Sequence, residues 1–238
     1  MKKRIWFLLP FAALTVAAFF LRRLTLVNGF DFQGLPIADG SWTFLILCCI
    51  AACALACAVS LRLSPRAKFA ENFRFSPMLM FVGIIGGMLF VAGSLFVWKQ
   101  AENTAQKLGA VLGIVGALGW VGVLAALKKG ATPNPWLQLP AILSCIPLFI
   151  LRFRAWGLDP ILGDYCFRLL ACAAQLLALF YLAGFAFDRG KRKMTVFLSM
   201  MAIFFAAAAL PDADAAMRLG LIGSALYCGS FSLQLLGD

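Results

Sequence analysis

Long apolar runs alternate with short polar connectors along the whole chain. The runs are continuous, without the alternation of apolar and polar residues that marks a membrane-barrel strand, and their lengths are close to the ~20 residues that a helix needs to cross the hydrocarbon core of a bilayer. Eight runs are present, at residues 5–21, 42–61, 78–98, 108–127, 136–151, 167–187, 195–210 and 219–236. Because a helix satisfies its own backbone polar groups in lipid, the pattern predicts an all-α fold, a polytopic integral membrane helical bundle of eight transmembrane helices.

Composition supports a chain that is embedded in lipid over its whole length. Of the 238 residues, 63% are hydrophobic and 13% are charged, whereas soluble domains contain about 25% charged residues. The first run begins with a basic segment, as a signal peptide would, but it continues into Leu21, Arg22 and Arg23 without a small-x-small cleavage motif. We therefore expect a retained first helix and a single integral membrane domain over residues 1–238.

The basic connectors predict the orientation of the bundle. The net charge is +11, but the Lys and Arg residues are spread over short connectors and do not form the basic face of a nucleic-acid-binding protein. With the amino terminus in the cytoplasm, thirteen of the 21 Lys and Arg residues lie in cytoplasmic segments and eight in external ones. Because cytoplasmic loops carry the excess of Lys and Arg, we expect both termini in the cytoplasm and a multi-pass protein of the cell membrane, specifically a bacterial plasma membrane.

The third and fourth runs are rich in glycine. Each contains a Gly-x-x-x-Gly motif, at Gly83 and Gly87 and at Gly109 and Gly113. Small residues at this spacing let two membrane helices approach closely, and the short connector between these runs makes their helices antiparallel neighbours. The four glycines are therefore expected to be helix-packing residues, with a thin wall beside a solute path as the alternative.

The fifth run contains two prolines, Pro140 and Pro147, seven residues apart. Each removes a hydrogen bond from a helix interior, so both are expected to kink the fifth helix on a similar face. Interrupted helices line binding sites in transporters, although kinks also arise for packing alone. The prolines are thus a positional indication of a cavity beside the fifth helix.

The connector between the second and third runs, SPRAKFAENFRFSP, has the pattern of a short surface helix. Phe69 and Phe73 lie one helical turn apart, and Arg66, Lys68 and Arg74 are placed to meet anionic headgroups. An amphipathic helix lying on the inner leaflet is one interpretation. A plain loop with snorkelling arginines is the other.

Short matches relate the two halves of the chain. Lys107-Leu-Gly opens the fourth run as Arg218-Leu-Gly opens the eighth, and a Gly-x-Asp tripeptide follows both the first and the fifth run. Two four-helix halves in parallel orientation, residues 1–130 and 131–238, would produce such matches. Chance is the alternative explanation, because the matches are only three residues long.

Polar residues are concentrated before and within the sixth run. Asp159 can cap a helix that begins at Pro160, and Asp164, Arg168 and Gln175 then share one face of that helix. One interpretation is an outward-facing vestibule with a positive mouth, edged by Arg168 and floored by Gln175, that admits a small anionic or polar solute. Its candidate residues are Arg152, Arg154, Asp159, Asp164, Arg168 and Gln175. The alternative is an interfacial rim in which the arginines snorkel and pair with Asp159 or Asp164.

Metal, cofactor and catalytic chemistry have little support in the residues. The chain contains no histidine, which is the commonest proton shuttle and metal ligand. Cys49, Cys53 and Cys57 share a helical face in the second run, but their neighbours are alanines at membrane depth, which favours packing over metal binding. The chain also has no acidic residue near the middle of a run. We therefore expect no metal, no cofactor and no enzyme activity.

Two function classes remain for the intact chain. A membrane scaffold, sensor or accessory subunit, with lipids and other membrane proteins as its partners and no nucleic acid, agrees with the long apolar runs and is the preferred interpretation. A transporter or permease subunit for a small polar or anionic solute, with the vestibule near the fifth and sixth helices, is the alternative. Because proton and sodium relays use carboxylates within the membrane, such transport is expected to be facilitative or driven by partner subunits.

Overall fold

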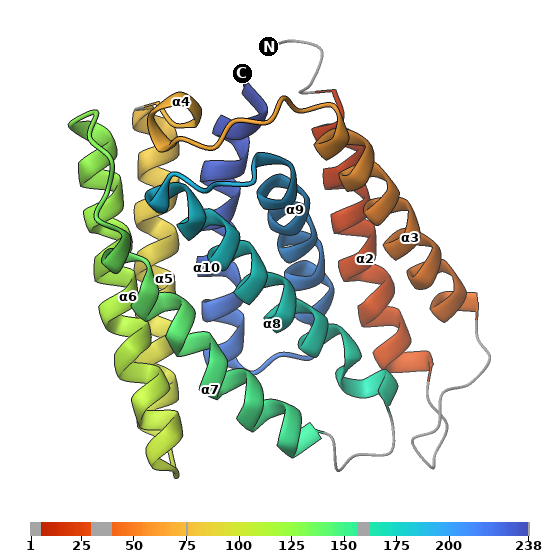
Figure 1. Ribbon diagram of the computed structural model, residues 1–238. Coiled ribbons are helices and arrows are strands. Elements are labelled where there is room, and N and C mark those ends of the chain that lie inside the picture. Colours follow the sequence, from red (N-terminus) through yellow and green to blue (C-terminus); the bar gives the residue numbers. More distant parts are fainter. Residues whose placement is uncertain (1–5, 30–39, 75, 157–161, 238) are drawn as a thin grey trace.

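The structure is a computed structural model that describes residues 6–29, 40–74, 76–156 and 162–237 (Figure 1). The described residues form eight long helices and no strand, which confirms the predicted all-α bundle. Each long helix is long and apolar enough to cross a membrane, so the chain is a multi-pass membrane protein. The eight helices are α2 (Leu8–Asn28), α3 (Gly40–Leu61), α5 (Pro77–Gln100), α6 (Thr104–Lys128), α7 (Leu139–Trp156), α8 (Leu162–Ala183), α9 (Arg192–Ala209) and α10 (Ala215–Gly237). Three short helical segments join them: α4 (Phe69–Asn72), η1 (Pro135–Leu137) and η2 (Gly184–Phe187).

Several helices begin and end at residues suited to those positions. Asn103 and Gln106 form a capping box at the start of α6, and Pro77 occupies the first turn of α5, where its missing N–H is not needed. The Asp214 carboxylate accepts a hydrogen bond of 2.6 Å from the backbone N–H of Met217 and so caps α10. These capping residues lie outside the apolar runs, so each of these helices begins before the apolar run that it contains.

The long helices run between two opposite ends of the bundle (Figure 1). The start of α2 and the end of α10 lie at the same end, which we call the terminal end, together with α4 and the turn between α8 and α9. The opposite end, which we call the distal end, holds the α5–α6 turn and the α9–α10 turn. An even number of crossings accounts for this arrangement. Which end faces the cytoplasm stays a prediction from the charge distribution.

Helices α9 and α10 lie at the centre of the bundle (Figure 1). Helix α9 packs against α2, α3, α8 and α10, while α10 packs most extensively against α5. The hairpin of α2 and α3 covers one side, and α5, α6 and α7 form the other. The four-plus-four repeat of residues 1–130 and 131–238 stays a prediction.

The most extensive helix contact, between α5 and α10, is made through glycines. A Cβ atom on Gly86 would lie 2.7 Å from the carbonyl oxygen of Gly223, and one on Gly93 would lie 2.9 Å from that of Ala216. Any side chain would push these backbones apart, so glycine is required for the close approach. The pattern of apolar residues gives no indication that these two helices are neighbours.

The four glycines of the predicted packing motifs are divided between two interfaces. Gly83, Gly87 and Gly113 lie where α5 meets α6, with Gly83 also facing Ser230 of α10. Gly109 instead faces Leu148 of α7. Helix α6 thus packs through its glycines against both α5 and α7.

The connector that contains α4 differs from both structures considered for it. Its helix has only four residues, and the rings of Phe69 and Phe73 are buried in the bundle instead of facing a leaflet. Phe73 packs edge-on against Phe185 and Phe231, with ring centroids 5.0 and 5.1 Å apart. The aromatic rings are buried because they close the space between the ends of α8 and α10.

The two prolines of the fifth run have different roles. The sequence predicted a kink at Pro140. That residue instead lies in the first turn of α7, where a proline is tolerated and does not interrupt the helix. Pro147 lies inside α7 and is the one described proline that removes a hydrogen bond from the interior of this helix. It is followed along the chain by Leu148 and Phe149, which contact the pocket described below.

Candidate functional site

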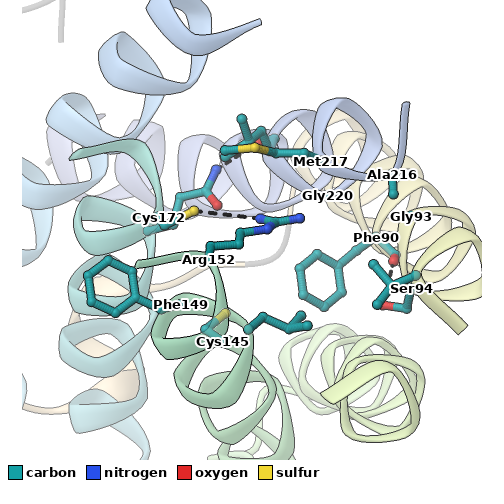
Figure 2. Close-up of a pocket in the computed structure, with 14 residues that line it drawn as sticks. Phe90, Gly93, Ser94, Cys145, Phe149, Arg152, Cys172, Ala216, Met217 and Gly220 are labelled. Carbon is teal, nitrogen blue, oxygen red and sulfur yellow. Dashed lines mark hydrogen bonds between the residues drawn. The ribbon is translucent and has the colours of Figure 1, made fainter. Parts of the chain in front are cut away.

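A pocket lies in the distal half of the bundle between α5, α7, α8 and α10 (Figure 2). It holds about 550 Å³ of space that protein atoms do not fill, part of which is open to solvent. Its lining residues are Phe90, Gly93, Ser94, Val97, Cys145, Leu148, Phe149, Arg152, Cys172, Gln175, Ala216, Met217, Gly220 and Leu221. Two of the residues predicted to line a vestibule, Arg152 and Gln175, are among them, and α5 and α10 supply the other walls.

Arg152 provides the charge of the pocket. Its side chain projects from α7 across the cavity, and its Nη1 lies 3.7 Å from the Sγ of Cys172 on α8 (Figure 2). The side chain is half-buried and forms no ion pair with any residue that the structure describes. A charge beside a mostly apolar cavity is stabilised by an opposite charge, so this guanidinium is suited to receive an anion.

Gln175 provides a fixed amide on the opposite wall. It is 6% exposed, and its Nε2 donates a hydrogen bond of 3.0 Å to the backbone carbonyl of Leu221 on α10. This bond fixes the orientation of the amide and leaves the side-chain oxygen as an acceptor. A ligand that carries both an anionic group and a hydrogen-bond donor would match Arg152 and Gln175 together.

The remaining walls are mostly apolar. Phe90, Leu148, Phe149 and Met217 present rings and aliphatic chains to the cavity. Ser94 uses its hydroxyl to donate a hydrogen bond of 2.9 Å to the carbonyl of Phe90 in its own helix. The pocket thus combines one cation and one amide with a largely hydrophobic surface, a composition that is common in small-molecule sites.

The pocket opens toward the distal end. A second hollow shares Val97, Leu148, Arg152 and Ala216 with the pocket, and it adds polar residues from the two neighbouring turns. These additional residues include Gln100, Gln106 and Asp214. The two hollows share four lining residues, among them Arg152, and we call them together the vestibule.

Aromatic side chains close the vestibule on the side of the terminal end. Phe90 in the pocket wall lies 4.8 Å from the ring of Trp120, which stacks on Tyr227 at 4.1 Å with an interplanar angle of 7°. Tyr227 in turn contacts Phe231, whose ring lies 5.1 Å from that of Phe73. We call these five residues the aromatic column. Trp120 is 1% exposed, so the column fills the space between the pocket and the terminal end.

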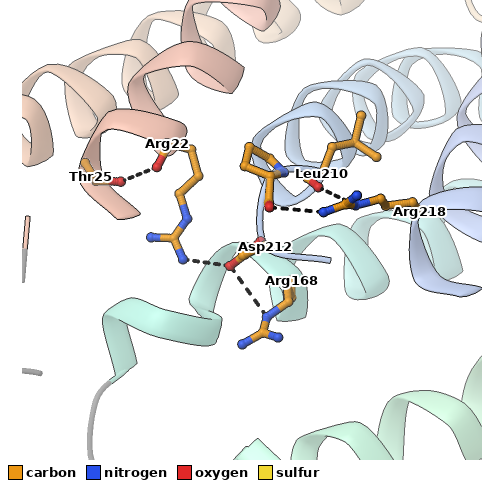
Figure 3. Close-up of polar contacts among 7 residues, drawn as sticks. Arg22, Thr25, Arg168, Leu210, Asp212 and Arg218 are labelled. Atoms are coloured by element: carbon orange, nitrogen blue, oxygen red, sulfur yellow. Dashed lines mark hydrogen bonds and ion pairs between the residues drawn. The ribbon is translucent and has the colours of Figure 1, made fainter. Parts of the chain in front are cut away.

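A cluster of charges holds the distal ends of three helices together (Figure 3). The Nη2 of Arg22 on α2 lies 2.8 Å from the Oδ2 of Asp212 in the α9–α10 turn, and the Nε of Arg168 on α8 lies 3.6 Å from the same oxygen. Arg22 is fully buried, and its guanidinium also lies over the rings of Trp42 and Phe167. Because a buried ion pair is strongly destabilised when one partner is removed, this cluster is a structural link between α2, α8 and α10.

The six predicted vestibule residues are distributed over different places. Arg152 and Gln175 line the pocket. Arg168, which was expected at the edge of the vestibule, contacts Asp212 and is not among the lining residues, and Arg154 is exposed on α7 outside the pocket wall. Asp159 and the side chain of Asp164 lie outside the part of the chain that the structure describes.

Two buried arginines were missed by the sequence analysis. Arg22 and Arg192 were counted as connector charges, yet both are buried. The Nε of Arg192 donates to the carbonyl of Leu235 at 3.0 Å and its Nη1 to the Oγ of Ser64 at 3.3 Å. Arg192 thus caps the end of α10 and holds the connector after α3. The one signal in the sequence is that Arg22 directly follows the first apolar run and Arg192 lies three residues before the seventh.

The cysteines of α3 do not form a metal site with other described residues. No group of three or more His, Cys, Asp or Glu side chains that could hold a metal ion occurs in the described parts of the chain. Cys53 and Cys57 are exposed on the outside of the bundle, while Cys48 and Cys49 are partly buried against the core.

Comparison of the chain with protein-family models, with curated proteins and with solved structures finds no match. The fold and the site themselves define the class, a multi-pass helical membrane protein with a vestibule at one end of the bundle.

Proposed function

We propose that the protein is a facilitative carrier, or the carrier subunit of a permease, for a small organic anion that enters from the distal end. The observation that supports this proposal is the half-buried Arg152, which has no ion-pair partner among the described residues and lies in a pocket open to that end. A scaffold that works only by packing has no need for such a cation. The vestibule therefore favours the transporter over the scaffold, the interpretation preferred from the sequence.

The proposal places the distal end outside the cell, in a plasma membrane. Of the Lys and Arg residues in the described parts of the chain, ten lie in segments at the terminal end and eight in segments at the distal end, and cytoplasmic loops carry the excess of these residues. The vestibule would then admit a solute from the external side.

The chemistry of the pocket favours a small carboxylate with an apolar body. A guanidinium can bind a carboxylate through two parallel hydrogen bonds, and the oxygen of Gln175 can accept from a hydroxyl or ammonium group of the ligand. Phe90, Phe149 and Met217 would pack against the apolar part. A phosphate ester is less well matched, because its additional charge would have only one cation to meet.

Transport through this protein would require the aromatic column to open. The column lies between the pocket and the terminal end, so under this proposal the structure would be the carrier state that is open on the distal side. No acidic residue occurs near the middle of an apolar run, and proton or sodium coupling usually needs one. Movement down a gradient is therefore the proposed mode.

The proposal predicts that anion binding depends on Arg152. Replacement of Arg152 by Gln removes the charge-assisted contact and should weaken binding by roughly 10- to 100-fold. The control is Arg154→Gln, which removes the same charge from an exposed position on the same helix. Binding is measured by the rise in thermal unfolding midpoint of the purified protein with a panel of small carboxylates.

Three results are distinguished by this experiment and by flux into vesicles. The carrier is supported if the anion stabilises the native protein and the Arg154→Gln variant but not the Arg152→Gln variant, and if the native protein also takes up the anion. Stabilisation without uptake supports a sensor that binds the same anion. Equal responses of all three proteins, or no response to any anion, would overturn the proposal.

A further inference from the structure

A second groove lies at the terminal end between α7 and α8, away from the vestibule. It contains about 1140 Å³ of space that protein atoms do not fill, part of which is open to the surroundings of the bundle. Its walls come from the first turns of α7 and from the end of α8 with η2, and they include Leu139, Ile142, Phe180, Tyr181 and Phe187. The part of the groove between α7 and α8 is therefore mostly apolar.

The groove faces the surroundings of the bundle and not its interior. The side chains of Phe180 and Phe187 are 59% and 50% exposed, and both belong to the sixth membrane-spanning segment. In a membrane, exposed apolar side chains of a spanning helix face lipid chains. A hydrocarbon chain is thus the chemical match for this part of the groove.

Two cations lie where the groove reaches the terminal end. Arg189 and Lys191 both line it, both are exposed, and neither forms an ion pair within the described parts of the chain. The intervening turn also leads directly into α9, whose N-cap residue Lys191 supplies no capping side-chain bond. The start of a helix carries a partial positive charge, so the two side chains and the helix start both favour an anion at this edge.

The combination of an apolar groove with a cationic edge has a specific occupant. We propose that the α7–α8 groove binds an anionic phospholipid, with one acyl chain along Phe180 and Phe187 and the phosphate beside Arg189 and Lys191. Basic residues at the membrane surface attract anionic lipids. The groove adds to this general attraction a defined place for the chain, which a scattered set of basic residues does not have.

The test is a titration of the full chain in detergent, with bound lipid counted by native mass spectrometry. Phosphatidylglycerol is compared with phosphatidylcholine of the same acyl chains, and glycerol 3-phosphate is added as a competitor. We expect phosphatidylglycerol to bind preferentially and glycerol 3-phosphate to displace little of it, because the soluble headgroup lacks the chain.

Variants locate the site. The Arg189→Gln, Lys191→Gln double variant should bind phosphatidylglycerol about tenfold more weakly. The Lys68→Gln, Lys129→Gln control removes two exposed charges from the same end outside the groove and should bind as the native protein does. Leu139→Trp narrows the groove with a residue that suits the membrane interface and should also weaken binding.

Several outcomes would overturn the lipid site. Equal binding of the two lipids would show that the negative charge of the headgroup does not contribute to binding. Equal binding by the double variant and the control would show that Arg189 and Lys191 do not bind the lipid. Displacement of the lipid by glycerol 3-phosphate, or full binding by Leu139→Trp, would leave a site for soluble phosphate and not for a lipid.

Discussion

At the residue scale, the fold depends on a few charged side chains that are buried in the bundle. Asp212 contacts arginines from two different helices, with Arg22 fully buried. Arg192 is buried at the other end of the bundle and bonds to the last turn of α10. Arg152 differs from both, because it is half-buried beside a cavity and no described carboxylate pairs with it. Two of these arginines therefore connect helices, and the third is placed for a ligand.

Replacement of Asp212 by Asn should destabilise the protein strongly. The amide keeps the shape of the carboxylate but leaves the buried Arg22 without its charged partner in the α9–α10 turn, at a cost of roughly 3 kcal/mol. The measurement is the thermal unfolding midpoint in detergent. Glu102→Gln, a loss of one acidic charge at an exposed position of the same end, serves as the control and should change little. An unfolding midpoint equal to that of the control would show that the pair is not a structural link.

At the scale of elements, the crossing of α5 and α10 sets one side of the vestibule. Gly86 and Gly223 allow the two backbones to touch, and this contact places Phe90 and Ser94 of α5 opposite Met217 and Leu221 of α10. A change in the separation of these helices would therefore also change the width of the pocket.

The glycine crossing is tested by a pair of alanine substitutions on one helix. A Cβ atom at position 223 would lie 2.6 Å from the carbonyl oxygen of Gly86, whereas one at position 220 meets no atom within 4 Å. Gly223→Ala should lower stability by about 1–3 kcal/mol, the usual effect of overpacking, and Gly220→Ala should not lower it. Equal stability of the two variants in an unfolding titration would contradict the crossing.

The number of helices was predictable from the sequence because length and hydropathy are local properties. Their ends were less so. The first run was ended at residue 21, yet α2 continues to Asn28, because Arg22 is neutralised by a residue 190 positions away. Such a contact leaves no trace in the local pattern.

The candidate site was predictable only in its polar part. Arg152 and Gln175 are conspicuous in an apolar chain, and both line the pocket. The walls from α5 and α10 were not found, because apolar runs do not indicate which distant helix they face. Arg168 was misplaced for the same reason, since its contact with Asp212 depends on how the α9–α10 turn lies over α8.

At the scale of the whole molecule, the two ends of the bundle have different properties. The distal end has a vestibule that leads to Arg152, while the aromatic column and the α4 connector fill the terminal end. The exposed basic edge of the α7–α8 groove also lies at the terminal end. This asymmetry is what a carrier that is open on one side of the membrane requires.

The most direct test of this account is the reactivity of single cysteines in intact cells toward a membrane-impermeant thiol reagent. Cys172 and a Val97→Cys variant line the vestibule, whereas Cys228 is fully buried next to the column residue Tyr227, and each is retained alone in a chain otherwise free of cysteine. The account predicts that the reagent added outside labels positions 97 and 172, that the transported anion protects them, and that Cys228 stays unlabelled. Labelling of Cys228 alone, or of neither vestibule position, would contradict an outward-open pocket at this end of the bundle.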